Sequence, residues 1–380
     1  MHNWDSIPYI AIAKSFEQPD PAALQAFTYA ELRRVLPAAT YDDLAREKGP
    51  GAGRGGPYRH AASTDAKVFA EILPIYRIRP VYTGAVYLMY KAGIDIEFAT
   101  HVLSGVMVAA GLGFLFLMAR NFLPLPLRYA PPLLALVFGA MDLARFSTPD
   151  GMAFCAWMLC AWLYLCGRRL ALLIALPAII AVRTDLVLFV VPLCLWLFMT
   201  ERRFWRATAL SLAASVVTHF GLLAYYQFPS WEHIFSCSLL TAQRCVHLAD
   251  APALGLHDYV AAVARGILGL FADANFVVYL VLVAAAVYLL HQRVKAMSWP
   301  GLFARSPTGL IFAGIACAGG RFLLYPAEWD RFFPAVYLLT AFGVLWLIGE
   351  RMAGVHADPT LTSRARVQVP RSTPGGTVQG

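Results

Sequence analysis

From Phe98 onward, long apolar segments alternate with short polar connections, whereas residues 1–97 contain no run of the about 20 apolar residues that cross a bilayer as a helix. Neither part shows the repeated alternation of a membrane barrel, so the apolar segments predict transmembrane helices. Within residues 1–97, Ile7–Phe16 and Pro21–Leu36 predict short amphipathic helices. We count nine apolar segments, at roughly 98–119, 127–144, 150–166, 170–182, 184–200, 207–226, 274–291, 308–324 and 332–349.

The composition supports the same class of protein. Of the 380 residues, 59% are hydrophobic and only 14% are charged, and the mean hydropathy is +0.58. Soluble domains have about 45–50% apolar and about 25% charged residues. The sequence therefore predicts an all-α polytopic membrane protein.

The distribution of Arg and Lys predicts how the chain crosses the membrane. Connections rich in cations alternate with connections that carry fewer cations and an acid, along all nine segments. Because cation-rich connections stay in the cytoplasm, residues 1–97 are expected outside and residues 351–380 form a disordered cytoplasmic tail. The bundle occupies residues 98–350, with an outer loop at 227–273.

The net charge of +8 is explained by this topology and does not indicate nucleic-acid binding. The Ala- and Arg-rich composition favours a bacterial inner membrane. Since residues 1–97 contain no helix that could carry them across, we expect one more transmembrane helix upstream of Met1.

Charged residues that are costly near a membrane gather on the predicted outer side, and such residues are functional candidates. Each could instead cap a helix or satisfy a neighbouring charge. The set is Asp5, Arg77, Arg79, Asp95, Glu97, Asp150, Arg183, Asp185, Arg321, Glu328, Asp330 and Arg331.

Two arginines favour function over capping. Arg183 and Arg331 each begin an apolar run, where a cation is disfavoured by the helix dipole. Arg183 and Asp185 also join two short segments, and short paired helices with charges at membrane depth commonly line cavities. Asp150 suits a helix start and a functional role equally, and Arg79 suits either a lipid phosphate or an interface anchor.

The seven cysteines show no metal-binding spacing. In the outer loop, Cys237 and Cys245 predict a disulfide on an oxidising face, while a zinc site that adds His233 and His247 is the alternative. His219, within an apolar run, is expected to be a hydrogen-bonded core residue. The sequence contains no Walker loop, serine-hydrolase elbow or zinc-protease motif.

Four short motifs, in order, resemble the GT-C superfamily of integral membrane glycosyltransferases, and within it the bacterial mannosyl- and arabinosyltransferase-like group that uses polyprenyl-phosphate sugars. The resemblance covers roughly residues 1–350. The motifs are Asn3-Trp4-Asp5-Ser6-Ile7-Pro8-Tyr9-Ile10, Ser147-Thr148-Pro149-Asp150-Gly151, Arg183-Thr184-Asp185 and Asp330-Arg331-Phe332-Phe333-Pro334.

The resemblance implies transfer of a sugar from a polyprenyl-phosphate donor to a lipid or glycan acceptor, with inversion. Arg331 and Arg183, with Arg79, would bind the phosphate, and Asp5 would be the general base. Asp150 would orient the acceptor or Arg183. The family's Asp-x-Asp motif is absent, and its nearest variant is Asp95-x-Glu97, so a divalent metal (Mg²⁺ or Mn²⁺) is left open and no other cofactor is implied.

Two other classes of protein remain open at this point. A transporter or flippase for a lipid or small anion would show internal repeats and broken helices near the midplane, but the halves of this sequence show no repeat. A non-catalytic envelope membrane protein would use the charged sites only as self-satisfied pairs. The gathering of charges on one face favours the enzyme.

Overall fold

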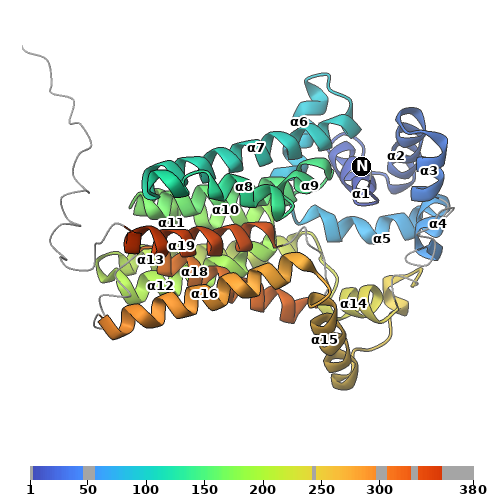
Figure 1. Cartoon of the computed structure of the whole chain (residues 1–380). Coiled ribbons are helices and arrows are strands. Elements are labelled where there is room, and N and C mark those ends of the chain that lie inside the picture. Colours follow the sequence, from blue (N-terminus) through green and yellow to red (C-terminus); the bar gives the residue numbers. More distant parts are fainter. Residues whose placement is uncertain (1–2, 46–55, 242–244, 297–305, 327–332, 353–380) are drawn as a thin grey trace, which may run out of the picture.

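The computed structural model describes residues 3–45, 56–241, 245–296, 306–326 and 333–352. Throughout these ranges the only regular structure is helical, as the sequence predicts. The long helices run side by side as a bundle, and the N-terminal helices gather at one end of it (Figure 1).

Six helices form the N-terminal layer at this end. They are α1 (Ser6–Ser15), α2 (Pro21–Val35), α3 (Ala38–Ala45), α4 (Gly56–Thr64), α5 (Ala66–Arg77) and α6 (Pro80–Lys91). Local chemistry explains their starts: the Asp20 side chain accepts a hydrogen bond from the Ala23 amide to cap α2, and Asp65 accepts one from Lys67 to cap α5.

The prediction that the first helix is amphipathic is wrong. Every residue of α1 from Ser6 to Ala13 is buried. The reason is that four helices pack around α1, namely α2, α5, α6 and α7 (Ile96–Phe122). The apolar side chains of α1 therefore belong to a second hydrophobic core. That core is separate from the main core of the bundle.

The bundle and its connections contain the remaining elements. They are α7 (Ile96–Phe122), η1 (Leu125–Leu127), α8 (Ala130–Val137), α9 (Ala140–Arg145), α10 (Asp150–Leu165), α11 (Arg169–Val182), η2 (Thr184–Leu186), α12 (Val187–Thr200), η3 (Arg202–Phe204), α13 (Trp205–Tyr225), α14 (Trp231–Phe235), η4 (Ser236–Leu240), η5 (Leu248–Asp250), α15 (Leu256–Leu270), α16 (Ala274–Ala296), α18 (Ser306–Leu324) and α19 (Pro334–Met352).

Five helical spans among the described residues are long and apolar enough to cross a membrane: Ile96–Phe122, Arg202–Tyr225, Ala274–Gln292, Pro307–Leu324 and Pro334–Met352. All nine predicted segments are helical, but the other four form shorter apolar helices. The helical membrane class is therefore supported, while the count of nine spans stays a prediction. Of the predicted 351–380 tail, only Arg351 and Met352 are described, and both belong to the last turn of α19.

One predicted segment, 127–144, divides into α8 and α9. Gly139 lies between them with a positive φ of +77°, a left-handed conformation that residues with a Cβ rarely adopt. After this break, α9 leads directly into the Ser147–Asp150 motif.

Candidate functional site

Asp5 lies in the turn that precedes α1. Its Oδ1 accepts a 2.7 Å hydrogen bond from the hydroxyl of Tyr76 on α5. Burial, and then the negative charge of Asp5, hold the pKa of Tyr76 well above its ordinary value. The hydroxyl therefore keeps its proton and fixes the orientation of the Asp5 carboxylate.

Arg79, the residue before α6, lies among the same aromatic side chains. Its Nη1 donates a 2.7 Å hydrogen bond to the Tyr9 hydroxyl. Its guanidinium carbon is 5.8 Å from the ring centre of Tyr9 and 5.5 Å from that of Tyr76, which is cation–π distance. Tyr76 thus contacts both Asp5 and Arg79, two residues that the sequence analysis singled out separately.

Four charged side chains form a continuous row at the end of the bundle. Arg183 Nη1 contacts Asp150 Oδ1 directly, and Arg183 Nε lies 2.8 Å from Asp185 Oδ1. Arg321 Nη1 in turn contacts Asp185 Oδ2. We call Asp150, Arg183, Asp185 and Arg321 the charge row.

The local sequence explains the position of the row. Asp150 opens α10, where the helix dipole favours an acid, and Thr148 Oγ1 donates a 2.7 Å hydrogen bond to its Oδ2. Arg183 has extended backbone (φ −159°) and separates α11 from η2. Only 9% of the Arg183 side chain and 5% of the Asp150 side chain is exposed. The two buried charges are opposite and therefore neutralise each other.

A small open pocket borders the charge row. All four charged residues line it. The other lining residues are apolar or small: Leu143, Ala153, Phe154, Trp157, Leu186, Cys317, Pro334 and Ala335. Such a pocket suits a ligand with a charged group joined to an apolar part.

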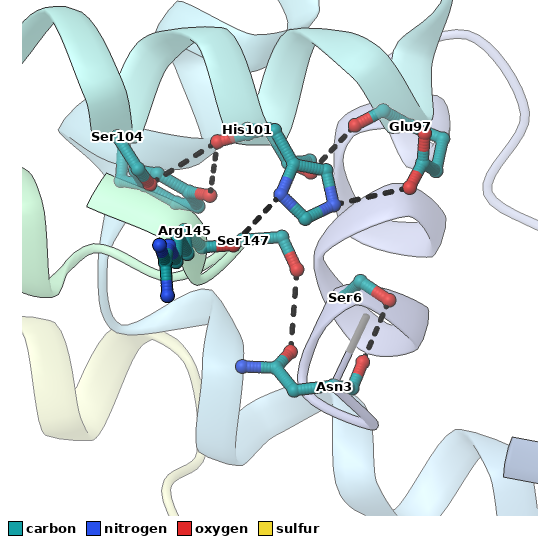
Figure 2. A network of polar contacts seen from close by, with 9 residues as sticks. Asn3, Ser6, Glu97, His101, Ser104, Arg145 and Ser147 are labelled. Atoms are coloured by element: carbon teal, nitrogen blue, oxygen red, sulfur yellow. Dashed lines mark hydrogen bonds and ion pairs between the residues drawn. The ribbon is translucent and has the colours of Figure 1, made fainter. Parts of the chain in front are cut away.

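Hydrogen bonds connect the N-terminal turn to the segment that carries Asp150. Ser147 Oγ donates to Asn3 Oδ1 at 3.2 Å, and Ser6 Oγ donates to the Asn3 carbonyl oxygen at 2.9 Å (Figure 2). Ser147 is fully buried. Motifs that lie more than 140 residues apart in the sequence therefore meet at one place.

A second set of contacts holds this segment from the side of α7. His101 faces the Arg145 carbonyl oxygen with Nδ1, at 3.0 Å, and Glu97 Oε1 with Nε2, at 3.1 Å (Figure 2). Ser104 Oγ donates to the Thr148 carbonyl oxygen at 2.8 Å. The stretch from Arg145 to Asp150 is thus fixed along its length by α7 and by Asn3.

The structure gives Asp95 and Glu97 separate partners. Asp95 Oδ1 lies 3.1 Å from Arg34 Nη2, whereas Glu97 pairs with His101. Across the described ranges, no three His, Cys, Asp or Glu side chains are grouped so that they could hold a metal ion. A divalent metal at the Asp95-x-Glu97 variant stays an untested prediction.

Cys237 and Cys245 lie within hydrogen-bonding reach of each other, both as thiols. Burial and the neighbouring Cys245 raise the pKa of Cys237 to about 12. His247 pairs with Glu71 at 2.9 Å and His233 with Ser230 at 2.6 Å, so the histidines of the alternative zinc site have other partners. The disulfide stays a prediction.

His219 is hydrogen-bonded, as predicted, but it lies at the margin of the bundle and not in its core. It is half-buried, and its Nδ1 lies 3.1 Å from the carbonyl oxygen of Thr184, inside the Arg183-Thr184-Asp185 motif. It supports the turn from outside the charge row.

Of the predicted site residues, the structure joins Asp5 with Arg79, and Asp150 with Arg183 and Asp185. Asp330 and Arg331 lie outside the described residues. Pro334, which lines the pocket, follows them closely in the sequence.

The sequence placed Arg321 among the charged candidates of the outer side without a specific role, and it gave no functional role to Cys317 or His101. Cys317 and Arg321 are four residues apart on α18, so both fall on one helix face, and both line the pocket. The spacing of a thiol and a cation in an apolar helix is the signal that could have found them. His101 gave no such signal, because its partner is a backbone carbonyl.

Comparisons with known proteins add no assignment: no family model, curated protein or solved structure matches this chain.

Proposed function

We propose that this protein is a membrane glycosyltransferase that transfers a sugar from a polyprenyl-phosphate donor to an acceptor hydroxyl at the extracytoplasmic face. One observation carries the proposal. Three of the four motifs that resemble the GT-C superfamily lie together, through the Asn3–Ser147 hydrogen bond and the Asp150–Arg183 ion pair.

The chemistry of the pocket supports a phosphate ligand. Arg183 and Arg321 present guanidinium groups, which bind phosphate oxygens in a fork, and Phe154 and Trp157 offer apolar surface for the lipid. Arg331, three residues before the pocket residue Pro334, is a further candidate for the same ligand.

In the proposed reaction, Asp5 takes the proton of the acceptor hydroxyl as its oxygen attacks the anomeric carbon. The bond between that carbon and the phosphate oxygen breaks, and the electron pair leaves with the polyprenyl phosphate. The arginines stabilise the charge on the leaving phosphate. Attack from the opposite side inverts the anomeric configuration.

Native mass spectrometry of the purified protein tests the donor site. We expect a co-purified polyprenyl phosphate or its sugar ester, or binding of added polyprenyl phosphate. Binding should fall at least tenfold in Arg321→Ala but stay unchanged in Arg265→Ala, an exposed arginine of α15 at the same end of the molecule. A protein that never retains or binds the lipid contradicts the proposal.

Asp5→Asn tests the enzyme against a transporter or a non-catalytic protein. With any donor that mass spectrometry identifies, we expect sugar transfer to fall by about 10²–10⁴-fold, the usual contribution of a general base, while lipid binding persists. Asp43→Asn, on an exposed residue of α3, is the matched control. Lipid binding with unchanged transfer contradicts the role of Asp5, and lipid movement without transfer would favour a flippase.

A further inference from the structure

Helix α15 is the amphipathic element of the connection between α13 and α16. One face packs on the protein: Ala262, Gly266 and Leu270 are buried. A Cβ at Gly266 would lie 2.7 Å from the Pro326 carbonyl oxygen, so the contact with the end of α18 is as close as two backbones allow.

A second face of α15 is apolar and exposed. Leu256, Val260, Ile267 and Phe271 follow one another at spacings of four, seven and four residues, which places them on one side of a helix. Leu256 is 80% exposed, and the neighbouring Leu268 is 73% exposed. Asp258 and Arg265 lie on the third, polar face.

The attachments of α15 fix its depth relative to the spanning helices. Its last residue, Leu270, is followed after three residues by the first residue of α16, Ala274. The Tyr259 hydroxyl donates a 2.8 Å hydrogen bond to the Leu323 carbonyl oxygen, at the C-terminal end of α18. Both α16 and α18 are long enough to cross a membrane. α15 therefore lies at the level where α16 begins and α18 ends, which is the bilayer surface.

The adjoining α14 is held at the same level. Trp231 Nε1 donates a 2.9 Å hydrogen bond to the Leu324 carbonyl oxygen. Trp231 and Phe235 pack with Tyr259, with ring centres 6.3 and 5.6 Å from it. Trp and Tyr gather at membrane–water interfaces because their rings are apolar and their polar atoms find partners there. α15 also runs across the direction of α16 (Figure 1).

We propose that α15 is an interfacial helix whose apolar face, formed by Leu256, Val260, Ile267, Leu268 and Phe271, lies in the lipid at the bilayer surface. The bilayer is the occupant because the face continues the exposed apolar surface of α16, where Val281 is 64% exposed. Its polar face meets the headgroups and water, as in other amphipathic helices that lie about 5–10 Å into the boundary of the acyl chains. The inference is independent of the proposed enzymatic activity.

Spin labels on two faces of the helix test this placement in the full chain. The variants Val260→Cys and Arg265→Cys are labelled with a nitroxide in a background where the accessible Cys155, Cys166 and Cys245 are replaced by Ser. The other four cysteines are buried. Each protein is reconstituted in vesicles of phosphatidylcholine and phosphatidylglycerol, and collision rates with oxygen and with a water-soluble nickel chelate are measured.

We expect the ratio of the oxygen rate to the nickel rate to be several-fold higher at position 260 than at position 265. Equal ratios, with free access of nickel at 260, would overturn the proposal because the apolar face would then lie in water. An immobile label at 260 that neither reagent reaches would also overturn it and would indicate that protein, such as a second copy of this chain, covers the face.

Discussion

At the scale of single residues, the charge row shows how few side chains determine the site. Arg183 contacts two acids from different elements, and both it and Asp150 are almost fully buried. The sequence analysis identified these residues because a cation at the start of an apolar run is unfavourable unless it has a partner. The sequence made Arg321 a candidate but did not predict its pairing with Asp185, because the two residues lie more than 130 positions apart.

Removing one member of the buried pair should cost more than removing both. Arg183→Met leaves Asp150 without its counter-charge, so we expect it to lower the free energy of unfolding by about 3–5 kcal/mol. The double variant Arg183→Met/Asp150→Leu should recover a large part of that loss. Thermal unfolding in detergent measures both, and a double variant less stable than Arg183→Met would contradict the pairing.

At the scale of elements, close helix packing positions the Asp150 segment. A Cβ at Gly151 would lie 2.7 Å from the Ser104 carbonyl oxygen, so α10 approaches α7 at a distance that only glycine permits. The sequence predicts both helices but not this approach, because their apolar patterns do not define which faces meet. The sequence predicted one segment at 127–144 where the structure has α8 and α9, because the break between them depends on the single residue Gly139.

Gly151→Ala should separate α10 from α7 and destabilise the protein by about 1–3 kcal/mol, as overpacked sites do. Gly113→Ala, on α7 with open space around its Cβ position, should be neutral or slightly stabilising. Melting temperatures of the two variants, measured side by side, test the prediction. Equal melting temperatures would contradict it.

The contact between Glu71 of α5 and His247, the residue before η5, should depend on pH. The hydrogen bond with Glu71, and then its charge, raise the pKa of His247 above its ordinary value of 6.5. The contact therefore contributes fully below the unfolded-state pKa and is lost as the pH rises through the higher folded-state pKa. Both side chains are partly exposed, so the effect is local.

Hydrogen exchange of residues 245–250 at a series of pH values measures this contact. After correction for intrinsic rates, we expect protection to decrease as the pH rises above about 6.5, His247's ordinary pKa. His247→Gln should remove the dependence. A pH-independent protection in the unaltered protein would contradict the assignment.

At the scale of the whole molecule, the described residues form two large hydrophobic cores, which share the helices α7, α10 and α11, and a smaller third cluster. The sequence was sufficient for the helical membrane class because that depends on composition and on the length of apolar runs. The sequence was insufficient to predict the burial of α1. A short apolar run of this kind also occurs in surface helices, and only the helices packed around α1 show that it is buried. Burial by distant segments is not encoded in the local pattern.

The burial of α1 predicts where the molecule resists exchange. Amides of α1 should exchange as slowly as those in the middle of α7, although α1 is only ten residues long, because both lie in packed cores. α4, at the margin of the N-terminal layer, should exchange faster. Hydrogen-exchange mass spectrometry resolves the three segments, and rapid exchange of α1 would contradict the second core.

The neutral charge row has a consequence for selectivity. Its two arginines already have acids as partners, so an incoming anion must compete with Asp150 or Asp185 for the guanidinium groups. Small inorganic anions gain too little to do so, whereas an amphiphile adds contacts with Phe154 and Trp157. The pocket should therefore bind inorganic phosphate weakly and bind anions that carry an apolar tail strongly. Titration of the protein with inorganic phosphate and with polyprenyl phosphate will compare the two affinities.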